Sequence, residues 1–128
     1  WVSSLVDARH GEVYGCLYQV NNLPKMATQY WAGPVGDFVR KAVTVAQGPI
    51  CFAGDGATAY WETIVEIVGS GAKRPISNSM YLRASSIALL GRQRLMAGER
   101  DDPLTLAPLY LRLAEAERKL RAKSSSCR

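Results

Sequence analysis

The chain begins with two runs rich in hydrophobic residues and separated by a short polar stretch. Residues 2–7 and 12–20 are each typical of a strand, and Gly11, between them, suits a short hairpin loop. The second run is apolar on both of its faces, which indicates a central strand. A turn cluster follows, and residues 26–31 are predicted to form a third strand.

The period then lengthens to that of a helix. Apolar positions recur at helical spacing over residues 35–46 and again over 57–68, so each stretch predicts an amphipathic helix. Pro34 suits the first turn of the first helix. Between the two helices, the short apolar run 50–53 is typical of a buried strand.

The last third of the chain carries weaker signals. Residues 74–77 predict a short strand, and Asn78 or Ser79 can cap a long helix that reaches about Ala97. Residues 106–111 are expected to be extended, at an edge or irregular because of a proline among them.

Three antiparallel strands followed by alternating helices and strands predict an α/β fold: a mixed sheet with helices on its faces. This is the element order of a ribonuclease-H-like half, and a ferredoxin-like sandwich fits it less well. The 128 residues suit one domain, which we place at residues 1–112, followed by a basic tail at 113–128. No apolar run reaches the length of a membrane span, so no membrane contact is expected.

Charge is concentrated at the end of the chain. The formal net charge is +5, and residues 112–128 hold six basic side chains against two acidic ones. A basic tail of this kind is commonly a solvated terminus, and contact with tRNA or an acidic partner is the alternative.

The metal-ligating residue types are few. The three cysteines, Cys16, Cys51 and Cys127, have no close spacing, and His10 is the single histidine. We therefore expect no zinc site and no metal, and the free cysteines suit a reducing cytoplasm. His10 is expected to be an exposed turn residue.

Only weak signals for catalysis or cofactor binding are present. Gly54, Asp55 and Gly56 lie between a strand and a helix, where phosphates dock in nucleotide-binding folds. The structural alternative is a turn in which Asp55 interacts favourably with the helix N-terminus. Asp7, Arg9 and Glu12 flank the first hairpin, either as a hydrogen-bond and ion-pair clamp or as an acid–base pair. Four aromatic residues on the apolar stripes are interpreted as packing residues: Tyr14, Tyr18, Tyr60 and Trp61.

Two segments at opposite ends of the chain resemble motifs of a known family. DARHGEVY at residues 7–14 resembles the DARxGEVY hairpin of the bacterial TsaB (YeaZ) family, and PLYLR at 108–112 resembles that family's PxYLR segment. The resemblance covers nearly the whole chain but only the second of the family's two halves. The IDTS-like strand and the GPGSFTGLR-like segment of the first half do not occur in it. We therefore interpret the chain as a fragment or a processed protein.

The resemblance implies a ribonuclease-H-like half of the acetate-kinase, heat-shock and actin superfamily (ASKHA). It also implies a cytoplasmic role in making threonylcarbamoyladenosine in tRNA. In that pathway a TsaB-like protein is not the catalyst. It supports a TsaD-like threonylcarbamoyl transferase together with a TsaE-like ATPase, and it can self-associate. Contact with tRNA would be indirect or weak. No catalytic residue and no cofactor is expected.

The residues that match the two motifs are expected to hold the hairpin and to dock the C-terminal segment. They are Asp7, Arg9, Gly11, Glu12 and Tyr14 in the first, and Pro108, Tyr110, Leu111 and Arg112 in the second. Two enzymatic alternatives stay open. One is an actin-superfamily kinase or ATPase that binds ATP through Gly54, Asp55 and Gly56. The other is a peptidase, as the family's older glycoprotease label says.

Overall fold

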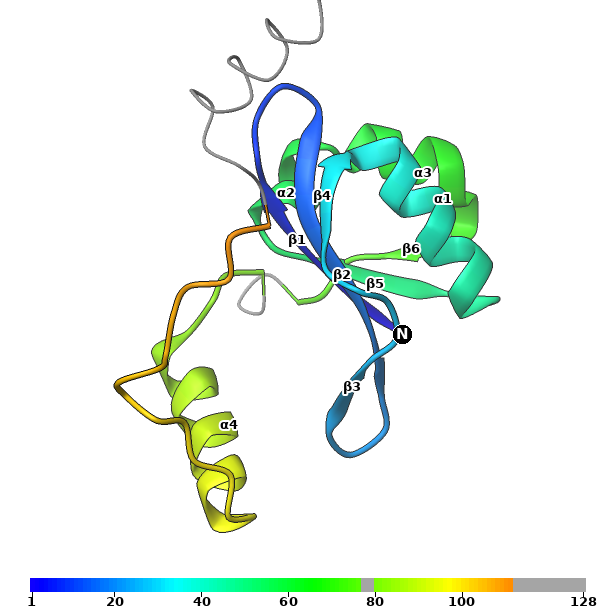
Figure 1. Cartoon of the computed structure of the whole chain (residues 1–128). Coiled ribbons are helices and arrows are strands. Elements are labelled where there is room, and N and C mark those ends of the chain that lie inside the picture. Colours follow the sequence, from blue (N-terminus) through cyan, green and yellow to red (C-terminus); the bar gives the residue numbers. More distant parts are fainter. Residues whose placement is uncertain (77–79, 112–128) are drawn as a thin grey trace, which may run out of the picture.

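The computed structural model describes residues 1–76 and 80–111, and within them it confirms an α/β fold built on a mixed sheet (Figure 1). The sheet order is β3-β2-β1-β5-β6, and β4 also pairs with β2. The strands are β1 (Val2–Asp7), β2 (Glu12–Val20), β3 (Pro24–Met26), β4 (Trp31–Pro34), β5 (Ile50–Ala53) and β6 (Ala72–Lys73). The helices are α1 (Val35–Ala46), α2 (Asp55–Ala59), α3 (Trp61–Val68) and α4 (Ala84–Met96), with a 3₁₀ turn, η1, at Gly69–Gly71.

The predicted hairpin is confirmed. Strands β1 and β2 are antiparallel, with Leu5 opposite Gly15 and Asp7 opposite Val13. On its other side β2 pairs with β3 and β4, so it is the central strand that its two apolar faces indicate. Strand β5, also confirmed, lies parallel to β1, and their carboxyl ends meet at the same edge of the sheet.

The prediction of one strand over residues 26–31 is wrong. Two short strands, β3 and β4, pair with β2 instead, because the ladder is interrupted at Thr28. The buried Thr28 hydroxyl accepts a hydrogen bond from the Leu17 amide at 3.0 Å, where a backbone carbonyl would otherwise stand. The chain then returns to β2 at Trp31.

The helix over residues 35–46 is confirmed, but Pro34 is not in its first turn. Pro34 is the last residue of β4 and the N-cap of α1, so the strand runs directly into the helix. The Val35 amide donates to the Gly11 carbonyl at 3.0 Å, which ties the start of α1 to the β1–β2 hairpin.

The stripe over residues 57–68 does not form one helix. It is divided at Tyr60 into α2 and α3, and α2 already begins at Asp55. Tyr60 leaves helical geometry, with φ −116° and ψ 28°, as its hydroxyl bonds to the hairpin. A contact between residues more than fifty positions apart leaves no trace in local periodicity.

The later elements differ more from expectation. The strand expected at 74–77 is displaced to β6, and Ser77 lies outside the described residues. The long helix begins at Ala84 rather than at Asn78 or Ser79, which are also outside the described residues. Residues 106–111, by contrast, are irregular, which is one of the two forms expected for them.

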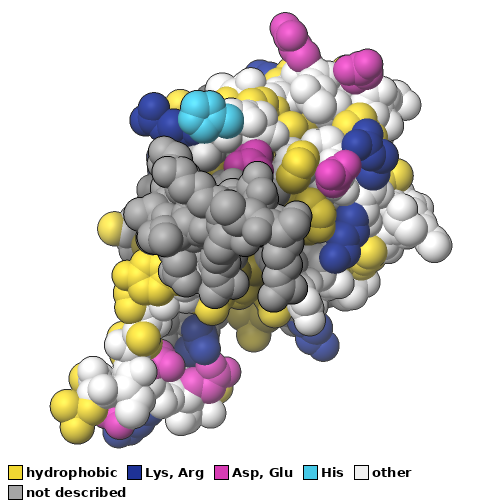
Figure 2. Space-filling view, turned by 45° about the horizontal axis from the view of Figure 1, so that its top comes forward, with side chains coloured by type: hydrophobic (Ala, Val, Ile, Leu, Met, Phe, Trp, Pro, Cys, Tyr) yellow, Lys and Arg dark blue, Asp and Glu magenta, His cyan; other side chains and the backbone are white. Residues whose placement is uncertain are grey.

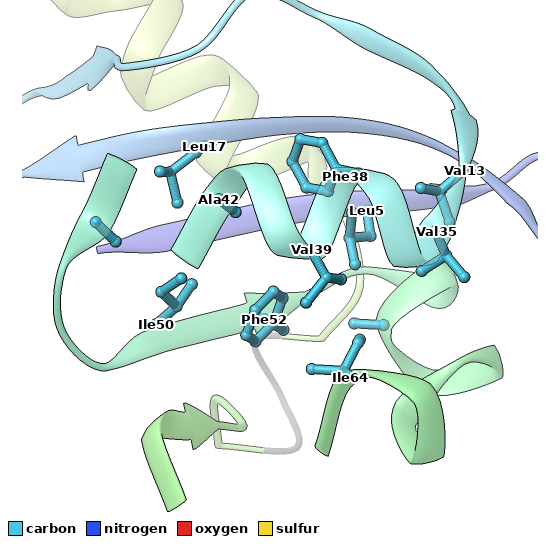
Figure 3. Close-up of a cluster of buried hydrophobic side chains, with 12 residues drawn as sticks. Leu5, Val13, Leu17, Val35, Phe38, Val39, Ala42, Ile50, Phe52 and Ile64 are labelled. Carbon is cyan, nitrogen blue, oxygen red and sulfur yellow. The ribbon is translucent and has the colours of Figure 1, made fainter. Parts of the chain in front are cut away.

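The core lies between the sheet and helices α1 and α3 (Figure 3). Gly15 is needed in it, because a Cβ there would stand 3.0 Å from Leu5 and from the Phe38 ring. The fully buried large apolar side chains are Leu5, Val13, Leu17, Phe38, Val39, Ile50, Phe52 and Ile64. Most face one side of the sheet, and in Figure 1 α1 and α3 cover that side.

Helix α4 stands apart from the sheet in Figure 1 and has no buried residue. None of the helices within residues 1–76 and 80–111 combines the length and the apolar character that crossing a membrane requires.

Candidate functional site

The hairpin motif and the strand-to-helix turn, far apart in the sequence, meet beyond the carboxyl ends of β1 and β5. We use "hairpin tip" for residues 8–11, which connect β1 to β2. The Gly54–Gly56 turn lies against the end of β1, and Tyr60 reaches the tip from the junction of α2 and α3. In α/β folds, ligands commonly bind at the edge of the sheet where the carboxyl ends of parallel strands lie.

Asp7 is the acceptor at the centre of this arrangement. Its Oδ1 accepts a hydrogen bond from the Tyr60 hydroxyl at 2.8 Å and another from the Arg9 amide at 2.7 Å. These two bonds, the Tyr60 bond first, lower the pKa of Asp7 below its ordinary 3.8. Asp7 is therefore held ionised near neutral pH, which suits a clamp and not a proton donor.

Tyr60 is the residue of this site that the sequence did not reveal. Its position on an apolar stripe predicts packing, and it does pack against the core cluster. Its hydroxyl also accepts a hydrogen bond from the Gly11 amide at 3.3 Å while donating to Asp7. The bond to ionised Asp7 raises the pKa of the Tyr60 hydroxyl.

The Asp55 side chain folds back onto the Gly54–Gly56 turn. Asp55 Oδ1 accepts from the Gly56 amide at 2.8 Å and from the Asp7 amide at 3.1 Å. Gly54 has φ +102°, and a Cβ there would lie 2.0 Å from the Leu5 carbonyl oxygen. The turn is thus pressed onto the backbone of β1, and the Gly56 amide already has a carboxylate acceptor.

The hairpin tip keeps an unusual backbone. Arg9, His10 and Gly11 have φ of +62°, +56° and +77°, all in the left-handed region. Arg9 and His10 are exposed, as expected for His10, and Figure 2 shows the histidine at the surface beside a basic side chain. Asp7 contacts Arg9 through its backbone amide. Of the expected clamp, the structure thus shows a hydrogen bond from the Arg9 amide to Asp7, and the charge of Arg9 adds a smaller attraction that also lowers the pKa of Asp7.

The second motif lies beside the first. Tyr14, Leu109, Tyr110 and Leu111 line a hollow of about 210 Å³, so the C-terminal segment meets β2 at Tyr14. Tyr110 and Leu109 are largely exposed there. Arg112, the last residue of this motif, and the basic tail lie outside the described residues.

Two other aromatic side chains on the apolar stripes, Trp61 and Tyr18, make contacts within the fold. Trp61 packs against the core cluster, and the Arg74 guanidinium stacks 4.1 Å from the centre of its ring. Burial, and then a hydrogen bond with Cys16, raise the pKa of Tyr18. These contacts agree with the interpretation of Trp61 and Tyr18 as packing residues.

The described part of the chain holds no group of three His, Cys, Asp or Glu side chains placed to bind a metal ion.

Cys16 is buried and its thiol contacts the Thr28 carbonyl at 3.2 Å, and burial raises the pKa of Cys51. A groove of about 590 Å³ runs from the Gly54–Gly56 turn along β1 to residues 80–83, and Asp55 and Arg83 are its ionised side chains. Among these groups none pairs a nucleophile with a base.

The chain is similar to a TsaB protein. The tRNA threonylcarbamoyladenosine biosynthesis protein TsaB of Bacillus subtilis (strain 168) is 30% identical to it over 119 residues. The matched region is 92% of this chain and 50% of that protein, so the chain spans about half the length of this relative. No family model matches the chain.

The similarity extends over nearly the whole chain, since 119 aligned residues are far more than the two short motifs contain.

Proposed function

We propose that the chain is one half of a TsaB-like protein and acts as a non-catalytic subunit in threonylcarbamoyladenosine modification of tRNA. In this proposal it supports a TsaD-like transferase and a TsaE-like ATPase in the cytoplasm. The observation that carries the proposal is the similarity to a curated TsaB along 92% of the chain. The sheet would then be a ribonuclease-H-like half, in keeping with the antiparallel β1–β2–β4 strands and the parallel β5.

The chemistry of the site supports a non-catalytic role. Asp7 is ionised and accepts two hydrogen bonds from its own chain, and Asp55 accepts two backbone amides. Both carboxylates thus stabilise the local structure. A general acid would need a raised pKa, whereas that of Asp7 is lowered.

The ATP-binding alternative requires phosphate oxygens at the Gly54–Gly56 turn. The Asp55 carboxylate stands where those oxygens would accept amide protons, and its charge repels them. Calorimetry of the complete protein with ATP and magnesium separates the two proposals. We expect no heat of binding, and a saturable signal that is lost in Asp55→Ala would support the ATPase instead.

The direct test is deletion of the gene in its own organism. Nucleosides from total tRNA are then quantified by mass spectrometry. We expect threonylcarbamoyladenosine to disappear and to return when the complete protein is supplied from a plasmid. An unchanged level of the modified nucleoside after deletion would refute the proposed function.

A further inference from the structure

The hairpin tip carries an arginine that its backbone does not favour. Hairpin loops whose residues have positive φ prefer Asn, Asp or Gly, because a longer side chain in the left-handed region is strained. Here Arg9 has φ +62°, and His10, a residue type that tolerates this region better, has φ +56°, directly before Gly11. A departure of this kind from a local rule is expected at functional or strained sites.

The tip is also held more firmly than a simple turn requires. The Ala8 amide donates to the Glu12 carbonyl at 3.0 Å, and the Glu12 amide donates to the Arg9 carbonyl at 3.1 Å. From outside the tip, Asp7, Tyr60 and the start of α1 each bond to its backbone. These bonds hold the backbone of Arg9 and His10 in one conformation and so fix the directions of their Cα–Cβ bonds. Binding of a ligand to the two side chains would therefore cost little backbone entropy.

The fold makes little use of these two side chains, whose charges are the two smallest contributions to the lowered pKa of Asp7. Arg9 and His10 are exposed, and no hydrogen bond or ion pair of either side chain occurs among residues 1–76 and 80–111. The contact between Arg9 and Asp7 uses the Arg9 amide and leaves the guanidinium for an external acceptor. Asn-Gly at these positions would build the same turn with less strain. Beyond this small effect on Asp7, the two exposed side chains are available for an external contact.

We propose that the hairpin tip is a contact site for RNA, in which Arg9 and His10 bind phosphate oxygens of the tRNA backbone. A guanidinium recognises phosphate through two parallel hydrogen bonds, and an imidazole adds a third donor. The choice of tRNA as the source of the phosphate rests on the proposed function. Asp7 and Asp55 behind the tip keep the local charge low, so the contact positions the RNA and contributes only part of the affinity.

The test uses the complete protein and an unmodified transcript of a tRNA that reads ANN codons. Binding is measured by fluorescence anisotropy over a series of salt concentrations. The double variant Arg9→Asn/His10→Gly replaces the two side chains with those that the backbone prefers. The matched control is Arg40→Gln on α1, which removes one positive charge from an exposed residue that is already paired with Asp37.

We expect the double variant to unfold at a higher urea concentration than the wild type, because the strain is relieved. We also expect it to bind the transcript about fivefold to tenfold more weakly, with a salt slope smaller by about one. Arg40→Gln should change affinity by less than about twofold. Stability and RNA affinity would thus move in opposite directions, which a purely structural role of the tip does not produce.

Three results would overturn the inference. The wild type does not bind the transcript, the double variant binds with the wild-type affinity and slope, or the double variant loses no more affinity than Arg40→Gln. If the double variant keeps its RNA affinity but no longer co-purifies with a TsaD-like protein, the tip contacts protein and the RNA proposal is wrong. The gene-deletion experiment is independent, so either proposal can fail while the other stands.

Discussion

Replacement of Gly54 by alanine tests how tightly the strand-to-helix turn is pressed onto β1. Gly54 has φ +102° and ψ 168°, a region that is nearly exclusive to glycine. Forcing another residue into it costs about 1–3 kcal/mol. The new Cβ would also lie 2.0 Å from the Leu5 carbonyl oxygen and 3.0 Å from the Leu5 carbonyl carbon. Displacing β1, whose Leu5 side chain is fully buried, adds about 1–3 kcal/mol.

Two other glycines separate the two effects. At Gly56 the backbone angle is ordinary, but a Cβ would stand 3.0 Å from the Asp7 nitrogen, so a loss from crowding alone is expected. At Gly69 φ is +64° and ψ is −137°, which favours glycine, but nothing lies within 4 Å of a Cβ, so a loss from backbone strain alone, about 1–3 kcal/mol, is expected. Urea unfolding followed by tryptophan fluorescence should therefore show a larger loss for Gly54→Ala, in which both effects act, than for Gly56→Ala or Gly69→Ala.

The result that would refute this reasoning is a Gly54→Ala variant as stable as Gly69→Ala. It would mean that the turn can move away from β1 to accommodate a Cβ. A turn that moves in this way could also accommodate a phosphate group, which would weaken the argument against the ATP-binding alternative.

Three further variants test other parts of the structure. Ser3→Ala should leave stability unchanged or raise it by about 1 kcal/mol in urea unfolding, because the fully buried Ser3 hydroxyl has no hydrogen-bond partner among residues 1–76 and 80–111. A loss above about 1 kcal/mol would contradict this. Phe38→Ala should cost about 3–5 kcal/mol in the same assay, since this ring fills the space between α1 and the sheet, and a loss below about 1 kcal/mol would place the core elsewhere. Tyr60→Phe should raise the pKa of Asp7 toward 3.8, as measured by NMR titration. Because the pKa of Asp7 is lowered in the folded state, ionised Asp7 stabilises the fold above pH 3.8, and this stability is lost as the pH falls through the folded-state pKa. Tyr60→Phe should therefore make the free energy of unfolding depend less on pH in this acid range. An unchanged acid dependence would contradict the prediction.

Local patterns predicted the parts of the fold that depend on neighbours in sequence. The hairpin, the helix at 35–46 and the strand at 50–53 each follow from a regular period bounded by turn residues. The division at Tyr60 and the gap at Thr28 follow from long-range hydrogen bonds, to Asp7 and to Leu17, which no window along the sequence contains.

The same distinction applies to the candidate site. The hairpin motif singled out Asp7, Arg9 and Gly11, but the sequence could not show that Tyr60 joins Asp7 to Gly11. It also left two interpretations of Asp55 open. The structure favours the structural one, because the Asp55 carboxylate accepts the amides of Gly56 and Asp7.

The central claim is that this protein is needed for tRNA modification and supplies no reacting group. Its most direct test is a reconstituted reaction with a TsaD-like transferase, a TsaE-like ATPase, the threonylcarbamoyl donor and tRNA. The complete protein is omitted, added as wild type, or added as Asp7→Asn, whose side-chain oxygen can still accept from Tyr60 and Arg9. We predict no threonylcarbamoyladenosine without the protein and a near wild-type rate with Asp7→Asn. Full modification in its absence, or a folded Asp7→Asn protein with a rate about a hundredfold lower, as expected on loss of a catalytic acid or base, would contradict the claim.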